Sequence, residues 1–296
     1  MAKLVLQGAL TAIVTPFTKK GAVDFLAFRR LIRRQLDAGI NGIVPCGSTG
    51  EAVTLNDKEY ASVIKCAVKE IGGYVPVIAG AGSNNTARAI ALSKIAQAQG
   101  VDGLLHVTPF YNKPTPNGLV AHYRAIVEAV NLPIILYNVP SRTGSNVLPN
   151  TIIRISKEVP GVVAVKEASG NIDQVRDIIK GARKGFITLS GDDAITFSAM
   201  KIGARGCISV VANEVPREFG ELCQEALAGN WKKAREIHLR LLPLMDINFI
   251  ESNPIPVKTA LSMMGLIEES FRLPLVQMEK QNKPKLKRCL KTLGLI

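Results

Sequence analysis

The chain has 296 residues, of which 47% are hydrophobic and 21% are charged, a composition typical of a globular protein with a large core. No apolar run approaches the roughly 20 residues of a membrane-spanning helix, and the apolar run within Met1–Gln7 is too short for a signal peptide. We therefore expect a soluble, cytoplasmic protein with no membrane partner.

The net charge of +13 would suit a nucleic-acid partner if basic residues clustered with interleaved aromatic ones. The densest basic cluster lies near the C-terminus and is interleaved with leucines only, which is typical of the solvated face of an amphipathic helix. Its members are Lys280, Lys283, Lys285, Lys287, Arg288 and Lys291. We expect no nucleic-acid partner, and a positive field that attracts anionic substrates is a second explanation of the charge.

The cysteines and histidines are not spaced like disulfide or metal sites. The five cysteines are far apart and form no CxxC pair, and the three histidines lack the spacing of metal ligands. We expect reduced, mostly buried thiols, structural histidines and no bound metal.

Short apolar runs typical of buried strands alternate with segments of helical spacing along most of the chain. The eight predicted strands are Leu10–Val14, Gly42–Pro45, Val75–Ala79, Gly103–Val107, Pro133–Tyr137, Val162–Val165, Phe186–Leu189 and Gly206–Val210. Asn56 and Glu59 predict a capping box at the start of one helix. Three glycines stand where helix C-caps are expected, at Gly39, Gly100 and Gly181.

Eight strand–helix units predict a parallel sheet closed into an α/β fold, the (β/α)₈ TIM barrel. An open doubly wound sheet is the alternative, but the turn Thr15–Gly21 lacks the glycine-rich phosphate motif of that fold. Beyond Asn230 the alternation stops. Three helices are predicted there, at Trp231–Met245, Ile255–Met264 and Met278–Leu293. We expect a barrel domain over residues 1–230 and a C-terminal helical domain over residues 231–296.

Lys166 follows four apolar residues, Val162–Val165, that read as a strand buried on both faces. Burial disfavours the ammonium form of a lysine, and the neutral amine is the form that attacks a carbonyl to make a Schiff base. Taken alone, the pattern also fits a lysine that extends to the surface at a strand end.

The other strand ends strengthen the catalytic interpretation, because catalytic groups of a barrel lie at the carboxyl ends of its strands. Individually each has a plainer reading: Tyr111 and Tyr137 as packing residues, Arg142 as an exposed loop residue, and at least one of Asp192 and Asp193 as a helix N-cap. Together they predict one active site at the barrel mouth. The strand-end segments are Gly47–Glu51, Thr108–Pro114, Tyr137–Gly144, Lys166–Gly170 and Ser190–Asp193.

These segments resemble the dihydrodipicolinate synthases, a branch of the pyruvate-dependent class I aldolase family, from about Gly8 to the C-terminus. Gly47–Glu51 (GSTGE) is similar to the family's pyruvate-binding motif. Tyr137–Gly144 (YNVPSRTG), which contains Arg142, is similar to this branch rather than to sialic-acid lyases and sugar-acid aldolases. Asn253–Lys258 (NPIPVK) also resembles this branch.

The resemblance implies a covalent mechanism without a metal or organic cofactor. Lys166 forms a Schiff base with pyruvate, and Tyr137, Ser48 and Tyr111 form a proton relay in which Tyr111 comes from a neighbouring subunit. Ser48 stands where threonine is commoner in the family. It keeps the hydroxyl and loses a methyl group, so the relay should survive with a less constrained orientation.

Four further residues are assigned to substrate binding by the same resemblance. Thr49 holds the pyruvate carboxylate, Arg142 binds the carboxylate of the second substrate, and Gly191 and Ile208 line the pyruvate pocket through backbone groups. An arginine suits a carboxylate because its guanidinium can bind both oxygens.

The implied activity is condensation of pyruvate with L-aspartate 4-semialdehyde and cyclisation of the product, in diaminopimelate and lysine biosynthesis, by a homotetramer built from two dimers. Two alternatives stay open. One is a related aldolase, such as an N-acetylneuraminate lyase or a 2-keto-3-deoxy-sugar-acid aldolase. The other is a non-catalytic paralogue that binds a keto acid.

Many family members are inhibited by lysine at a subunit interface, where histidines and a glutamate hold the effector. This chain has Asp57 and Tyr60 at the histidine positions, Arg88 at the glutamate position and Phe110 where tyrosine is common. An arginine that faces the effector's ammonium group repels it. We therefore expect weak or absent inhibition by lysine.

Overall fold

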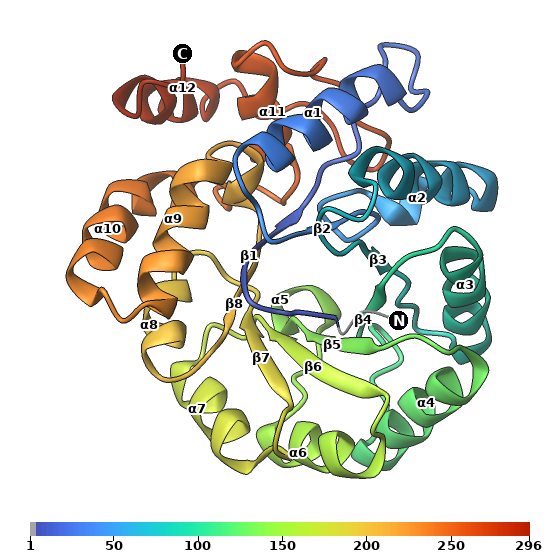
Figure 1. Ribbon diagram of the computed structural model, residues 1–296. Coiled ribbons are helices and arrows are strands. Elements are labelled where there is room, and N and C mark those ends of the chain that lie inside the picture. The colour runs from blue at the N-terminus through green and yellow to red at the C-terminus, as the bar shows by residue number, and fades with distance from the viewer. Residues whose placement is uncertain (1–3) are drawn as a thin grey trace.

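The computed structural model describes residues 4–296, so the first three residues of the N-terminal segment considered above lie outside the described part (Figure 1). Eight parallel strands form one sheet in the order β2-β1-β8-β7-β6-β5-β4-β3, and a parallel bridge between Ile43 and Val77 joins its two ends. The predicted (β/α)₈ barrel is confirmed. The strands are β1 Gly8–Ala12, β2 Gly42–Val44, β3 Ile78–Gly80, β4 Gly103–Val107, β5 Ile134–Asn138, β6 Val162–Glu167, β7 Ile187–Ser190 and β8 Gly206–Ser209.

One buried side chain from each strand fills the interior of the barrel. Because side chains alternate between the two faces of a strand, their neighbours point outward and pack against the helices. The interior therefore forms a solid floor beneath the carboxyl ends of the strands, and only those ends are open to a ligand. The eight interior residues are Leu10, Val44, Ile78, Leu105, Ile135, Ala164, Leu189 and Ile208.

Helices surround this ring, as Figure 1 shows, with α11 and α12 at the top of the view next to α1. The helices that cover the outside of the barrel are α1 Phe25–Asp37, α2 Asp57–Ile71, α3 Thr86–Ala98, α4 Pro116–Ala129, α6 Pro149–Glu158, α7 Ile172–Gly181, α8 Thr196–Lys201 and α9 Pro216–Leu227. The short helix α5 Pro140–Thr143 lies inside this ring in Figure 1, next to the strand ends. The C-terminal helices are α10 Trp231–Ile247, α11 Ile255–Met263 and α12 Lys283–Thr292, and two short 3₁₀ turns are Ala52–Thr54 and Val211–Asn213.

The predicted helix ends are confirmed at three of four positions. Asn56 and Glu59 form both hydrogen bonds of a capping box at the start of α2. Gly39 and Gly100 follow α1 and α3 with φ angles of 76° and 83°. Gly181 is different, because it is the last residue of α7. A Cβ there would lie 2.4 Å from Cδ1 of Ile153, so this glycine permits close packing of α7 against α6.

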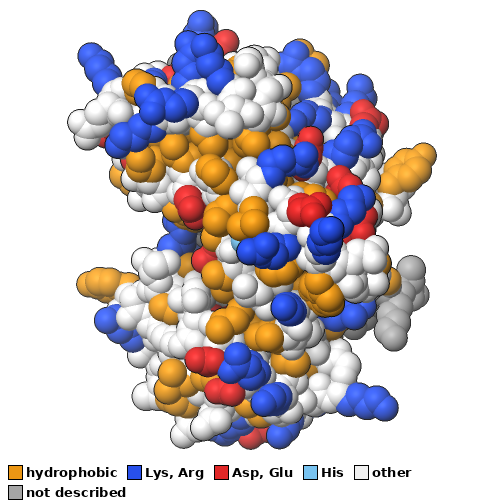
Figure 2. Space-filling model, turned by 90° about the vertical axis from the view of Figure 1, so that its left-hand side faces the viewer, with side chains coloured by type: hydrophobic (Ala, Val, Ile, Leu, Met, Phe, Trp, Pro, Cys, Tyr) orange, Lys and Arg blue, Asp and Glu red, His pale blue; other side chains and the backbone are white. Residues whose placement is uncertain are grey.

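The last helix is shorter than predicted. It begins at Lys283 rather than at Met278, and Pro284 stands in its first turn. A proline is tolerated there because the first N–H groups of a helix have no partner within the helix. Leu286 and Leu290 are fully buried, which confirms the amphipathic character predicted from the basic cluster. Figure 2 shows many of the Lys and Arg side chains at the top of the molecule, where α12 lies.

The C-terminal helices share a core with the barrel. α10 packs against α9, and α12 packs against both α10 and α11. One continuous apolar cluster contains residues of the barrel layer, such as Phe28 and Phe219, together with Leu241, Leu261 and Leu290. Within residues 4–296, no helix is both long and apolar enough to cross a membrane.

Candidate active site

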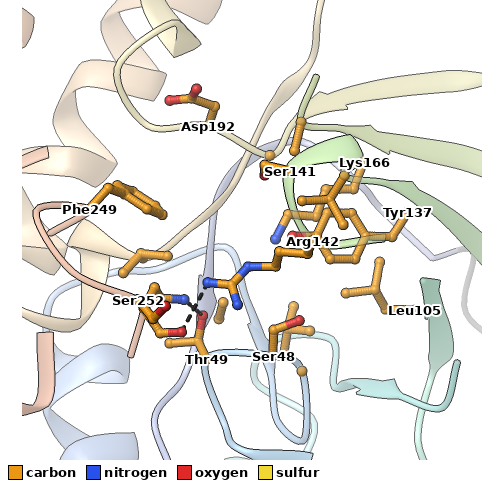
Figure 3. Close-up of a pocket in the computed structure, with 18 of the residues that line it drawn as sticks. Ser48, Thr49, Leu105, Tyr137, Ser141, Arg142, Lys166, Asp192, Phe249 and Ser252 are labelled. Carbon is orange, nitrogen blue, oxygen red and sulfur yellow. Dashed lines mark hydrogen bonds between the residues drawn. The ribbon is translucent and has the colours of Figure 1, made fainter. Parts of the chain in front are cut away.

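A cavity of about 580 Å³ opens at the carboxyl ends of the strands. Figure 3 shows side chains from β5, β6, the turn after β2 and the segment after α10 converging on it. The cavity thus collects most of the predicted site in one place. Six of the predicted site residues line it, namely Ser48, Thr49, Tyr137, Arg142, Lys166 and Gly191.

Lys166 and Tyr137 form the floor of this cavity. They are direct neighbours in the register of β5 and β6, and their exposed fractions are 5% and 7%. The Lys166 Nζ lies 4.3 Å from the centroid of the Tyr137 ring. A nearly buried amine beside a tyrosine ring is an arrangement in which the amine can attack a carbonyl and the tyrosine can exchange protons with the adduct.

Gly191, immediately after β7, leaves room for the Lys166 side chain. A Cβ at this position would lie 2.9 Å from both Cγ and Cε of Lys166, closer than real side-chain contacts allow. Its N–H donates to the Glu167 carbonyl at 2.7 Å, which keeps this stretch of backbone beside β6. The absence of a side chain at residue 191 is therefore a condition for the observed lysine conformation.

The turn that carries the exposed Ser48 and the buried Thr49 is tight. It is bounded by two non-glycine residues with left-handed backbone, Cys46 with φ of 56° and Glu51 with φ of 51°. Such conformations are disfavoured for residues with a Cβ and persist where the surroundings fix them. Here β3 approaches so closely that a Cβ on Gly80 would lie 2.1 Å from the Cys46 carbonyl oxygen.

Asn253 connects this turn to Arg142. Its side-chain Nδ2 donates to Thr49 Oγ1 at 2.9 Å, and its backbone carbonyl accepts a hydrogen bond of 2.9 Å from Arg142 Nη2. Arg142 lies on α5, directly after β5, and its guanidinium extends across the cavity in Figure 3. One residue from beyond the barrel therefore touches both predicted carboxylate-binding side chains.

Sequence reasoning missed several lining residues. The segment after α10 contributes Phe249, Glu251, Ser252 and Asn253. Asn253 begins the motif NPIPVK, which resembles the family branch, but the resemblance gave no role for this residue. Its contact with Thr49 depends on how the C-terminal segment folds back onto the barrel. Asp192, from the predicted strand-end segment Ser190–Asp193, also lines the cavity. Burial raises the pKa of the Asp192 carboxyl above its usual value, while hydrogen bonds from the backbone N–H groups of Ala194 and Ile195 act in the opposite direction.

A buried polar network supports the ends of β5 and β6. The Glu167 carboxylate accepts hydrogen bonds from Ser169 N at 2.8 Å, Asn138 Nδ2 at 3.0 Å and Gln174 Nε2 at 3.2 Å. A buried carboxylate needs such donors to offset its lost hydration. The network fixes the backbone on either side of Lys166, because Asn138 and Glu167 each follow a cavity-lining residue of their strand.

Two predicted site residues do not line the cavity. Tyr111 is 88% exposed, in a loop where its φ is 69° and its N–H lies 3.4 Å from the Thr143 carbonyl oxygen. Ile208 has its side chain in the interior layer of the barrel, and the residue that lines the cavity here is Val210, directly after β8.

The expectation that Asp192 or Asp193 caps a helix is wrong. α8 begins at Thr196 with Ile195 at the cap position and no side-chain cap. Asp192 instead accepts from Ala194 N at 2.9 Å in the preceding turn, and Asp193 accepts from Val210 N at 3.0 Å and Val211 N at 2.8 Å. The buried Asp193 thereby holds the end of β8, a long-range contact that local sequence does not reveal.

A second cavity of about 500 Å³ contains three of the four residues singled out for lysine regulation, Tyr60, Arg88 and Phe110. Arg88 Nη1 donates to the carboxylate of the fourth, Asp57, at 2.9 Å. The buried Tyr60 hydroxyl donates to the Gly80 carbonyl at 2.9 Å. Burial raises the pKa of Tyr60 well above its usual value. Asp57 is thus engaged by Arg88.

The five cysteines are free thiols, and within the described residues no cluster of histidine, cysteine and acidic side chains has the arrangement of a metal site.

Residues 5–293 match the family described as the Dihydrodipicolinate synthetase family. The chain belongs to this family.

Similar proteins match it over nearly the full length. A 4-hydroxy-tetrahydrodipicolinate synthase of Maridesulfovibrio salexigens is 53% identical over 290 residues, covering 98% of this chain and 99% of the relative. The crystal structure of dihydrodipicolinate synthase from Thermotoga maritima matches with a TM-score of 0.96 at 45% identity, covering 98% of this chain and 99% of that one. The chloride-inhibited synthase of Acinetobacter baumannii, complexed with pyruvate, matches with a TM-score of 0.97 at 42% identity, covering 99% and 100%.

Proposed function

We propose that Lys166 is the Schiff-base nucleophile of a 4-hydroxy-tetrahydrodipicolinate synthase. The chain is a lyase of the class I aldolase type, and it condenses pyruvate with L-aspartate 4-semialdehyde in diaminopimelate and lysine biosynthesis. The observation that carries the assignment of Lys166 is its position, nearly buried beside Tyr137 in a cavity that also presents Thr49 and Arg142.

The reaction proceeds through an imine and an enamine. The neutral Lys166 amine attacks the pyruvate carbonyl carbon, and loss of water gives an iminium that withdraws electrons from the methyl carbon. A methyl proton leaves, and the enamine carbon attacks the aldehyde carbon of the second substrate. The amine of that substrate then attacks the imine carbon, which closes the ring and releases Lys166. No metal or organic cofactor takes part in this scheme.

In the proposed scheme Tyr137, Ser48 and Tyr111 move protons. Tyr137 protonates the departing water in this scheme, a role supported by the 4.3 Å between its ring centroid and the Lys166 Nζ. Ser48 lines the same cavity and supplies a second hydroxyl. Tyr111 is supplied by a neighbouring subunit, a role that its 88% exposure supports.

In this proposal, other residues of the cavity bind the substrate carboxylates. Thr49 and the backbone of its turn receive the pyruvate carboxylate, and Arg142 receives that of aspartate semialdehyde. Gly191 and Ile208 complete the pyruvate pocket through backbone groups. Asn253 supports the first two of these roles because it contacts both side chains.

We further propose that the protein works in the cytoplasm as a homotetramer, a dimer of dimers, with small-molecule substrates and no nucleic-acid partner. Its basic C-terminal helix supports the last point, because α12 buries Leu286 and Leu290 and turns its lysines outward without interleaved aromatic side chains.

Turnover of pyruvate with aspartate semialdehyde, coupled to a reductase that consumes NADPH, tests the assignment. We expect turnover in the wild type, none in Lys166→Ala, and unchanged turnover in the control Lys184→Ala, whose side chain is exposed. A folded wild type that forms the pyruvate adduct without turnover would instead favour an aldolase with another acceptor, such as a sialic-acid or sugar-acid aldolase. A chain that binds pyruvate without forming an adduct would favour the non-catalytic paralogue.

A further inference from the structure

A buried ion pair ties the C-terminal segment to the turn that carries Ser48 and Thr49. Lys258 Nζ on α11 lies 2.5 Å from Glu51 Oε1, and the two side chains are 0% and 1% exposed. Every other ion pair formed within residues 4–296 is at least partly exposed. The pair therefore differs in kind from the surface pairs of this protein.

Aromatic rings surround the lysine of this pair. The Lys258 Nζ lies 4.3 Å from the Phe17 ring centroid and 5.0 Å from that of Phe271. The Arg272 guanidinium lies 4.5 Å from the Phe17 ring. Burial lowers the pKa of Lys258, and the Glu51 carboxylate opposes that shift. Because desolvation of both charges costs free energy, such a pair is weak evidence for stability and points to a role in fixing one conformation.

The conformation it fixes is that of the turn. Glu51 is the last residue of the turn and has the left-handed φ of 51°, while its N–H donates to the Ser48 carbonyl at 3.1 Å. The hydrogen bond between Glu51 and Ser48 therefore couples the position of Glu51 to the backbone that carries Ser48 and Thr49. Anchoring its carboxylate on Lys258 sets the position of one end of the turn.

The second anchor is already in the cavity. Asn253 is five residues before Lys258 and donates to Thr49 Oγ1, and its carbonyl accepts from Arg142. Lys258 and Asn253 thus hold the same turn from the same C-terminal segment. A shift of α11 relative to β2 would move the two contacts together.

We propose that Glu51 and Lys258 are positioning residues of the active site, and that their buried pair holds Thr49 and Ser48 at the distance from Lys166 that pyruvate requires. The inference rests on the proposed function, in which Thr49 receives the pyruvate carboxylate. Neither Glu51 nor Lys258 lines the cavity that contains Lys166. Lys258 lies behind the turn and is fully buried.

The test is the pyruvate dependence of borohydride trapping at Lys166, measured by mass spectrometry in Glu51→Gln and Lys258→Met. A displacement of Thr49 by about 1 Å would weaken its contact with the pyruvate carboxylate. We therefore expect the pyruvate concentration for half-maximal trapping to rise about tenfold or more. At saturating pyruvate, borohydride should still trap the adduct on Lys166 in both variants. The double variant Glu51→Gln/Lys258→Gln, which restores a neutral hydrogen-bonded pair, should recover much of the loss.

The matched control is Lys283→Met, which breaks the partly buried Lys283–Glu269 pair elsewhere in the C-terminal part. It should shift the melting temperature and leave the pyruvate dependence unchanged. If a single variant fails to fold, Glu51→Asp takes its place, because it keeps the charge and shortens the reach by one methylene.

Folded pair variants with wild-type pyruvate dependence would overturn the positioning role, as would a change equal to that of Lys283→Met. A wild-type chain that traps no pyruvate would instead contradict the proposed function, and the positioning role with it. The two failures are therefore distinguishable from the wild-type measurement alone.

Discussion

Gly191 lies where the backbone after β7 passes closest to the side chain of Lys166. Replacing it with alanine adds a Cβ at 2.7 Å from Ala168 Cβ and at 2.9 Å from Cγ and Cε of Lys166, so we expect the lysine side chain to be displaced. Because small displacements of a reacting group are costly, we expect kcat/KM of Gly191→Ala to fall about a hundredfold. Steady-state kinetics of the coupled reaction measure this.

The control for that substitution is Gly220→Ala, in the interior of α9, where an added Cβ meets no atom within 4 Å. Alanine is favoured over glycine within a helix by roughly 0.5–1 kcal/mol, so this variant should be slightly more stable and fully active. Full activity in Gly191→Ala would contradict the account of the lysine pocket.

Arg88 determines the expected response to lysine. Its guanidinium lines the second cavity and engages Asp57. In the arrangement that the family resemblance implies, the ammonium of an effector lysine would face this cation and be repelled by it. We expect most activity to remain at millimolar lysine, measured in the coupled reaction. Arg88→Glu reverses the charge and should increase the response. Loss of most activity in the wild type at millimolar lysine would contradict the prediction.

At the scale of single residues, much of the cavity lining was predictable because the residues at strand ends converge. Lys166, Tyr137 and Thr49 follow directly from that rule, and they line one cavity. Asn253 did not follow from it, because it arrives from beyond the barrel and its contact depends on the return of the C-terminal segment. The contacts of Asp193 with the end of β8 are long-range in the same way.

The elements themselves were set by local pattern, and their ends by tertiary context. Strand β4 coincides with the predicted Gly103–Val107, where the apolar run is bounded on both sides. β3 begins at Ile78 rather than at Val75, and Pro76, which has no N–H to donate, precedes it. Helix α12 starts late for a similar reason, because Pro284 fits only its first turn.

The buried His106 on β4 and His122 on α4 make these elements sensitive to acid. Burial lowers the pKa of His106 to about 3 and that of His122 to about 4. Because the folded-state pKa values lie below the unfolded value of about 6.5, the unfolded chain binds more protons. The contribution of these groups to stability is therefore fully present above pH 6.5 and is lost progressively as the pH falls toward 4.

Urea unfolding between pH 7.5 and 4.5 measures this effect. Each buried histidine steepens the loss by up to about 1.4 kcal/mol per pH unit. In His122→Gln, which cannot titrate, we expect a shallower slope than in the wild type. An equal slope in both proteins would show that other groups control acid stability.

As a whole molecule, the barrel and the C-terminal helices act together. The apolar core runs from the barrel layer into α10, α11 and α12 without interruption. We propose that residues 1–230 are the barrel domain and residues 231–296 a helical domain that completes it, because Asn253 and Lys258 of the latter hold a turn of the former. The alternation of strands and helices predicted the division, whereas the contacts across it required the folded structure.

The proposed role of the exposed Tyr111 links activity to the oligomeric state. If Tyr111 serves a neighbouring subunit, activity requires at least a dimer. We expect gel filtration with light scattering to show a tetramer, activity per chain to fall on dilution below the dissociation range, and Tyr111→Phe to lower kcat without dissociating the assembly. A fully active monomer would contradict the role of Tyr111.

In the proposed reaction, Lys166 forms the covalent adduct with pyruvate. Reduction of the intact protein with borohydride in the presence of pyruvate, followed by peptide mass spectrometry, tests it most directly. The account predicts one added pyruvate-derived mass per chain, located at Lys166 and absent from Lys166→Ala. An unmodified Lys166 in folded protein, or an adduct on a different lysine, would contradict it.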